Sequence, residues 1–436
     1  MDGVTELTGH RLARARQARG MTRVDLAQAI RAAAWRRGLR SGADKHRVRK
    51  WEVDGVVPDA DSQSYIAEAL KIPQEAVDAD SWPHWLPPVA IPLGPFSTVP
   101  ALREALTVDR RALLLTVPAT ALTALAADWA HADAHPLAPA RDGQPVGSEL
   151  VDVLEHTAGR LTALVTEQRQ HTAPLLDAHL TTVSDLIAHG RYTRPLGLRL
   201  HTLAAGLAQS IGWHRFDLGR HQAATAYWTA ALHSAHAAGD RDLGAAVLGD
   251  LAYGAAWRGD HTTAGAILHH ALARADHPAA RALLHLRRGR ALATQGEKKE
   301  THRQFAAAEH QLGAAASRER PAFCTWLSTA DLAIDSGQAL GDLGDPGAHR
   351  LIREGQDLLP AARAKTRGVF LAYQAASHLD RREPEHAAAA ARESLTLART
   401  IGAPRCVQLV EDLVPRFTLY PHAEGVPELL TLARTA

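Results

Sequence analysis

Apolar residues recur every three or four positions in several short stretches of the first eighty residues, and each stretch predicts an amphipathic helix. Glycine, proline or charged residues separate the stretches from one another. The pattern therefore predicts four or five short helices around a small core, with helices at 9–20, 21–35, 44–53 and 61–72.

Three of these helices have a residue near their start that favours a helix N-terminus. Thr22, Asp44 and Asp61 can each accept a hydrogen bond from a backbone N–H of the first turn. In the stretch that begins at Asp44, Val48 and Trp51 are three residues apart and therefore share one helical face. We expect both to be buried in the core.

From about residue 148 the pattern changes to longer helices that form pairs, and the pairs repeat. A segment with a glycine, then a small, a large apolar and another small residue recurs with starts 37 to 48 residues apart. Repeats of this length with two helices per unit are typical of an α-solenoid and resemble the tetratricopeptide pattern. The repeated segments are 218–232, 258–272, 295–309 and 381–395, with a looser copy at 343–358.

Between the two helical regions, prolines interrupt the helical pattern of the sequence. Six prolines between residues 83 and 100 exclude a continuous helix, and Trp82, Trp85 and Phe96 favour an ordered strap over a flexible tether. The segment 109–129 has paired arginines before an apolar run, as export signals do. Its run is only about sixteen residues, short for a membrane span, so we interpret it as a buried helix.

These patterns predict an all-α chain with four parts. We expect a small domain of short helices over 1–80, a Pro/aromatic strap over 81–108, a connecting helix and loop over 109–147, and a repeat domain over 148–436.

Charge is distributed unevenly along the chain, although its net value is only +2. Residues 10–50 hold thirteen Arg or Lys against two acidic residues, so the rest of the chain is acidic. A local excess of that size attracts polyanions. Two cysteines are too few for a disulfide framework and fit a reducing compartment, so we expect a cytoplasmic protein that is not membrane-bound.

The stretch 44–58, DKHRVRKWEVDGVVP, resembles the recognition helix of xenobiotic-response-element helix-turn-helix regulators, a class related to phage repressors. The match includes Val48, Trp51, Glu52 and Pro58, and continues in IAEALKIPQEAV at 66–77. The resemblance implies that 1–80 is a DNA-binding helix-turn-helix domain. Its recognition helix would lie in the major groove of double-stranded DNA, with arginine or lysine donating to guanine or phosphate. The expected DNA contacts are Arg23, Arg36, Arg37, Arg40, Lys45, His46, Arg47, Arg49 and Lys50.

The connection before this helix departs from the family, whose turn has three or four residues. Here 31–43 intervenes, so either the second helix continues to Arg37 or a basic loop over 38–43 replaces the turn. In either case Arg36, Arg37 and Arg40 would add contacts to the DNA backbone.

A repressor-like head joined to tetratricopeptide-like repeats resembles quorum-sensing regulators, in which a peptide occupies the concave repeat surface. Many actinobacterial regulators share this layout, including a strap like WPHWLP at 82–87. Such receptors often hold the peptide with asparagine, and this chain has none, so the signal is either a peptide held by other side chains or a small molecule. The candidate ligand residues are Trp213, His214, Tyr253, Trp257, Arg258, Arg288, Trp326 and Tyr373.

No catalytic or metal-binding motif stands out, so we expect no enzyme activity, no metal and no cofactor. The pattern favours a sequence-specific transcriptional regulator that forms a homodimer through its repeats and senses a signal. The alternative is an interaction scaffold with only non-specific DNA affinity; a hidden enzyme in the repeats is a weaker one.

Overall fold

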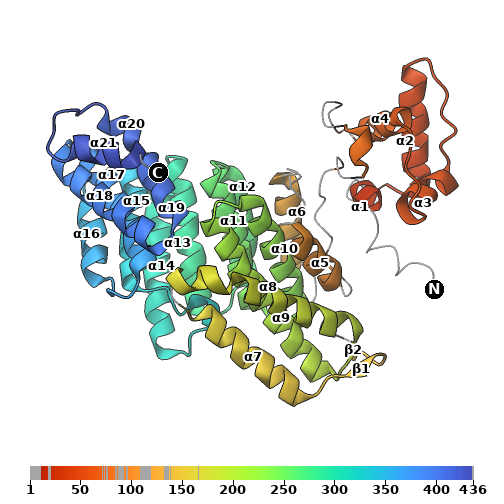
Figure 1. The fold of residues 1–436 in the computed structure, drawn as a ribbon, viewed down its shortest axis with the longest axis horizontal. Coiled ribbons are helices and arrows are strands. Elements are labelled where there is room, and N and C mark those ends of the chain that lie inside the picture. Colours follow the sequence, from red (N-terminus) through yellow and green to blue (C-terminus); the bar gives the residue numbers. More distant parts are fainter. Residues whose placement is uncertain are drawn as a thin grey trace.

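The computed structural model describes residues 11–17, 21–70, 72, 74, 77–83, 86, 93–94, 97–108, 119–131, 137, 139–164 and 166–434. In these residues the chain is all-α, as predicted, apart from β1 (Gln144–Pro145) and β2 (Gly190–Arg191), which pair in parallel. Figure 1 shows two groups of helices, which we call the head (α1–α4) and the body (α5–α21).

The head contains the short helices that the apolar pattern predicts. They are α1 (Arg11–Gln17), α2 (Arg23–Arg36), α3 (Lys45–Val53) and α4 (Ala60–Ala69), followed by a short 3-10 turn, η2 (Ala79–Ser81). Leu12, Ile30, Val48 and Trp51 are buried in one shared core. The first part of the predicted strap joins this core through Leu86, whereas Trp85 and Phe96 lie outside the described residues.

Two of the three predicted helix caps are confirmed and one is wrong. Thr22 accepts from the backbone N–H of Asp25 in a capping box, and Asp44 accepts from the N–H of Arg47 at 2.7 Å. The cap of α4 is Asp59, which accepts from Ser62 N at 2.7 Å, and not Asp61. The helix begins two residues earlier than its apolar face indicates, which places Asp61 in the first turn.

The boundary between strap and body differs from the expected one. Residues 98–108 form α5 (Thr98–Val108), and 119–131 form α6 (Ala119–His131). Both supply side chains to the largest core of the body, including Leu102 and Trp129, because their apolar residues recur at helical spacing. The buried helix predicted for 109–129 is confirmed for its second part, while 109–118 lie outside the described residues.

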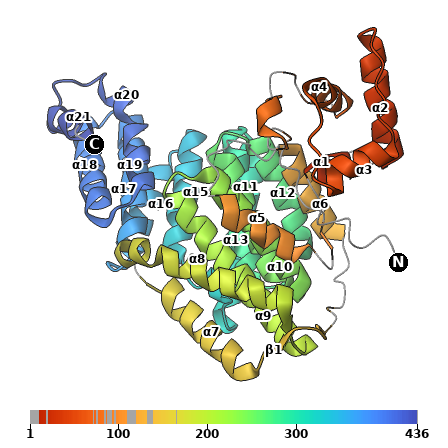
Figure 2. The ribbon, with the colours of Figure 1, turned by 45° about the vertical axis from the view of Figure 1, so that its right-hand side comes forward.

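The body continues as an array of paired helices, which confirms the solenoid-like arrangement. After α7 (Ser148–Thr162) and α8 (Thr166–His189), both views place α17–α21 at one end and α6 at the other (Figure 1 and Figure 2). The pairs are α9 (Arg194–Asp217) with α10 (His221–Ala238), α11 (Arg241–Trp257) with α12 (His261–Arg274), α13 (Pro278–Thr294) with α14 (Lys298–Ala314), α15 (Thr329–Asp342) with α16 (Ala348–Leu358), and α17 (Ala364–Asp380) with α18 (Pro384–Ile401).

The repeated sequence segments fall on the second helix of each pair. First helices of successive pairs also pack on one another, so they line one side of the array. The body ends with α19 (Pro404–Glu411), α20 (Val414–Phe417) and α21 (Val426–Arg434); η3 (Ala315–Ser317) and η4 (Ala322–Cys324) lie between α14 and α15.

A residue in the left-handed region makes the tight turn inside each pair. Gly219, Gly259, Gly296 and Gly344 have φ between 67° and 80°, and the fifth position is Arg382 with φ 62°. Glycine adopts this conformation without steric cost, which explains the glycine of the repeated pattern.

Glycine also allows the two helices of a pair to approach closely. A Cβ atom on Gly212 would lie 2.5 Å from Cδ1 of Trp228, and one on Gly289 would lie 2.4 Å from Cε1 of Phe305. In these two pairs the large apolar residue of the repeat therefore packs directly on a glycine of the first helix.

We expect two Gly→Ala substitutions in α9 to have opposite effects. Gly212→Ala should lower the free energy of unfolding by about 1–3 kcal/mol, because its methyl group overlaps the Trp228 indole. Gly206→Ala should raise it by about 0.5–1 kcal/mol, because no atom lies within 4 Å of the added Cβ and alanine favours helix. Urea unfolding followed by circular dichroism measures both; shifts of the same sign would contradict the packing.

Candidate functional site

The exposed face of α3 is strongly basic. Val48 and Trp51 anchor the helix in the core of the head, and Glu52 is buried beside them, so the basic side chains lie on the exposed face. Among these, Lys45 and Lys50 form no side-chain hydrogen bond or ion pair with the described residues, and Arg49 lies 3.5 Å from Asp54. The exposed basic side chains of α3 are Lys45, His46, Arg47, Arg49 and Lys50.

A buried carboxylate fixes the other end of α3. Both oxygens of Glu52 are used: Oε1 accepts from Nε of Arg16 and Oε2 from Nε of Arg23, each at 2.7 Å. Arg16 also donates to the carbonyl of Met21 at 2.7 Å. The Trp-Glu pair of the sequence therefore has structural roles, since Trp51 fills the core and Glu52 joins α1, α2 and α3.

Besides Arg49 with its long contact to Asp54, three of the predicted DNA-binding arginines have close carboxylate partners. Arg23 bonds to Glu52, while Arg36 and Arg37 lie 2.8 and 2.9 Å from Glu68 of α4. The structure thus separates the predicted set into arginines that hold helices of the head together and exposed cations on α3.

The connection between α2 and α3 combines the two possibilities that the sequence left open. The second helix continues to Arg36 with Arg37 as its cap, and a loop then leads to Asp44. Arg31 donates to the carbonyl of Ala43 at 2.6 Å, which ties the end of the loop back to α2. Arg40 is exposed on this loop.

In the body, charged and aromatic side chains from the first helices and from α19 meet in one cluster. We call this set the inner cluster. It brings together residues far apart in sequence, because α9 and α11 contact α17 and α19 through side chains. Its members are Trp213, Phe216, Asp217, Asp250, Tyr253, Trp257, Arg287, Arg290, Asp335, Lys365, Tyr373 and Arg405.

Three guanidinium groups of the inner cluster, those of Arg287, Arg290 and Arg405, lie over aromatic rings. Arg287 lies 5.7 Å from the ring centroids of both Trp213 and Tyr253. Arg290 lies 5.9 Å from Tyr253 and 5.5 Å from Tyr373. Such contacts are attractive because a ring face carries negative potential, and they strengthen when water is excluded.

Each guanidinium group also has a carboxylate partner. Arg287 lies 2.8 Å from Asp250, and Arg290 lies 2.9 Å from Asp335. Burial raises the pKa of Asp250 and Asp335, with the facing arginine opposing the shift in each case.

Asp217 has two cationic partners on the far end of the body. It forms ion pairs with Lys365 of α17 and, at 3.4 Å, with Arg405 of α19. Burial acts to raise the pKa of Asp217, but the two cations outweigh it and the pKa is lowered. The carboxylate is therefore ionised and connects α9 to α17 and α19.

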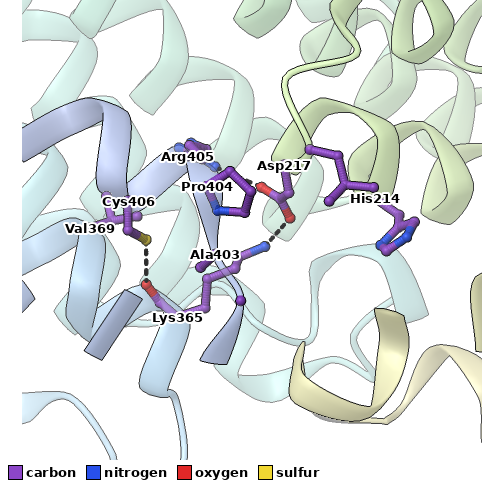
Figure 3. A pocket seen from close by; sticks show the side chains of 10 residues that line it. His214, Asp217, Lys365, Val369, Ala403, Pro404, Arg405 and Cys406 are labelled. Atoms are coloured by element: carbon purple, nitrogen blue, oxygen red, sulfur yellow. Dashed lines mark hydrogen bonds and ion pairs between the residues drawn. The ribbon is translucent and has the colours of Figure 1, made fainter. Parts of the chain in front are cut away.

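A small pocket lies beside this connection. Figure 3 shows Asp217, Lys365 and Arg405 on its wall, with His214 on the opposite side. Its volume is about 30 Å³, enough for only one or a few water molecules. A larger ligand would have to displace a side chain.

The structure brings five of the eight predicted ligand residues to this region. Four of them belong to the inner cluster, and His214 lines the pocket. Arg258 is an exposed cap of α11, and Trp326 is exposed, with its Nε1 donating to the carbonyl of Phe323 at 2.9 Å. Arg288 lies away from the cluster and interacts electrostatically with Glu300 of α14.

Sequence reasoning missed all of the charged members of the inner cluster. Arg287 and Arg290 are three residues apart and share a helical face, whereas Arg288 is rotated from Arg287 by about 100°. This spacing could have indicated that Arg287 and Arg290, and not Arg288, lie together on one face of the helix. The partners Lys365 and Arg405 lie 148 and 188 positions from Asp217, and no local pattern reveals such contacts.

Both cysteines are buried and free. Burial raises the pKa of Cys324 to about 12 and that of Cys406 to about 11. A thiol with such a pKa is protonated at neutral pH and is a poor nucleophile.

Comparison with known families matches the head alone. A family model described as the SP15 N-terminal domain matches residues 12–72, which cover α1 to α4. No curated protein matches the chain. Among the described helices, none has both the length and the apolar character needed to cross a membrane.

Proposed function

We propose that this protein is a cytoplasmic, sequence-specific DNA-binding transcriptional regulator whose head reads DNA through α3. The observation that carries the proposal is the basic, exposed face of α3 opposite an anchored, buried face. A helix held in this way can enter the major groove as a rigid unit, with lysine and arginine donating to base edges and phosphates. Its resemblance to repressor-type recognition helices supports the same role.

Lys45 and Lys50 are the sharpest test, because they have no side-chain hydrogen bond or ion pair among the described residues that a substitution would disturb. Each Lys→Ala variant should bind genomic target fragments about 10-fold more weakly, consistent with loss of one base or phosphate contact. Fluorescence anisotropy at several salt concentrations measures the affinity and its salt dependence.

Lys299→Ala is the matched control, because it removes the same charge from an exposed position of α14 in the body. It should leave affinity unchanged. If the α3 variants also bind as wild type does, α3 is not the reading helix. Affinity that falls steeply with salt but shows no sequence preference would favour the scaffold alternative.

We further propose that the body forms a homodimer and senses a signal on the side lined by the first helices. Two heads reading adjacent half-sites bind more tightly than one, since the second contact is intramolecular. The inner cluster supports the sensing role, because it gathers aromatic and charged side chains from both ends of the array.

A further inference from the structure

The guanidinium group of Arg405 lies inside an aromatic cage. Its central carbon is 5.1 Å from the ring centroid of Trp257, 5.2 Å from that of Tyr253 and 5.5 Å from that of Phe216. Its nitrogens also donate to the carboxylate of Asp217 and to the hydroxyl of Tyr253. Three ring faces, a carboxylate and a phenol oxygen thus surround one planar cation.

The cage is complete without the element that carries Arg405. Its walls belong to α9 and α11, the first helices of two successive pairs, which contact each other, whereas Arg405 comes from α19. The rings also hold one another: the centroid of Phe216 lies 5.5 Å from that of Trp257 and 5.6 Å from that of Tyr253. The walls are therefore built from contacts that do not need the arginine.

The chemistry of the cage selects a guanidinium group. Flat ring faces attract a planar, weakly hydrated cation, and a carboxylate and a hydroxyl oxygen at its edge accept its N–H groups. An ammonium ion is more strongly hydrated and loses more on entering such a site. In addition, Nε of Arg405 has no hydrogen-bond partner among the described residues, so ring contacts and the edge oxygens provide its binding.

Arg405 also borders the small pocket described above. It is one of the residues that line the pocket in Figure 3, together with Lys365 and His214. The eight-residue helix α19 that carries it follows a turn at Gly402.

We propose that the cage of Phe216, Tyr253, Trp257 and Asp217 is a guanidinium-binding site that Arg405 fills as an internal ligand, and that the signal sensed by the body carries a guanidinium group. Displacing Arg405 would free α19 from α9 and α11 and so loosen the contact between the two ends of the array. The inference rests on the proposed sensing role and is independent of DNA binding.

An internal ligand competes at high effective concentration, so a simple guanidinium compound should not displace Arg405 from the wild-type chain. Removing the arginine reveals the site. Full-length Arg405→Ala should bind guanidinium ion and arginine amide saturably at millimolar concentration, with a change in tryptophan fluorescence and a rise in Tm. The wild type should show neither response, and urea, a neutral molecule of the same shape, should give none with the variant.

A tripeptide amide, Gly-Arg-Gly, distinguishes two sources of the same chemistry. Tighter binding than arginine amide indicates an arginine within a peptide, and equal binding indicates a free guanidino compound; either supports the site. Arg416→Ala is the matched control, because Arg416 bonds to the exposed Asp380 at 2.6 Å and lies outside the cage. It should respond as wild type does.

No saturable response from folded Arg405→Ala, or an equal response from Arg416→Ala, would overturn the proposal. If Arg405→Ala does not fold, Arg405→Gln takes its place, since its shorter neutral side chain leaves most of the cage empty and should give the same selective response. Trp257→Ala added to either variant must abolish binding, and retained binding would place the ligand elsewhere. These measurements contain no DNA, so their failure leaves the DNA-binding proposal untouched.

Discussion

Replacing Glu52 with alanine is expected to unfold the head while the body stays folded. The Glu52 side chain has no exposed surface and holds both Arg16 and Arg23. Removing it leaves two guanidinium groups without their carboxylate in a buried setting. Breaking a buried ion pair from one side costs about 3–5 kcal/mol. At roughly 0.05–0.15 kcal/mol per residue, a head of about 80 residues has a total stability of about 4–12 kcal/mol, so the loss removes a large part or all of it.

Glu68→Ala is the matched control, because Glu68 also holds two arginines. Its side chain is 28% exposed and those of Arg36 and Arg37 are 58% and 38% exposed, so water replaces the lost partner. Its loss should cost at most about 1 kcal/mol. Limited proteolysis and thermal unfolding measure the head, and the body supplies an internal reference. Equal sensitivity of the two variants would mean that burial at Glu52 does not control the stability of the head.

The features that sequence predicted well are those set by neighbours along the chain. Val48 and Trp51 share a helical face, and both are buried as expected. The repeated glycine marks a turn that needs positive φ. All five turns have a residue with positive φ, and in four of them that residue is glycine. Local spacing fixes such features because a helix presents residues three and four apart on one side.

The features that sequence missed depend on contacts between distant segments. The proline-rich sequence suggested that the strap continues to residue 108, but the apolar face of α5 packs in the core of the body. The basic residues near Glu52 appeared as one DNA-binding set, yet Arg23 faces a carboxylate 29 positions away. Arg405 gives no local sign of its role, since its cage is formed by residues more than 140 positions earlier.

Asp250→Ala is expected to destabilise the body by about 3–5 kcal/mol. The side chains of Asp250 and Arg287 are 2% and 7% exposed, so neither charge is solvated after its partner is lost. Besides Asp250, the guanidinium group of Arg287 contacts the rings of Trp213 and Tyr253, which cannot accept its N–H groups as a carboxylate does. Its Nη1 already has no hydrogen-bond partner among the described residues, so the variant would leave a buried cation with little compensation. Urea unfolding followed by circular dichroism measures the loss.

The double variant Asp250→Leu with Arg287→Met should recover most of that loss. Burial raises the pKa of Asp250 even with Arg287 facing it, which means that the ionised carboxylate is held at a cost. A buried pair of this kind is worth little relative to apolar side chains of similar size, whereas one half left alone is costly. Asp380→Ala provides the solvated comparison, because its partner Arg416 is exposed, and it should cost at most about 1 kcal/mol. If the double variant is as unstable as Asp250→Ala, the pair contributes specific stability that apolar packing cannot replace, and the reasoning from desolvation is wrong.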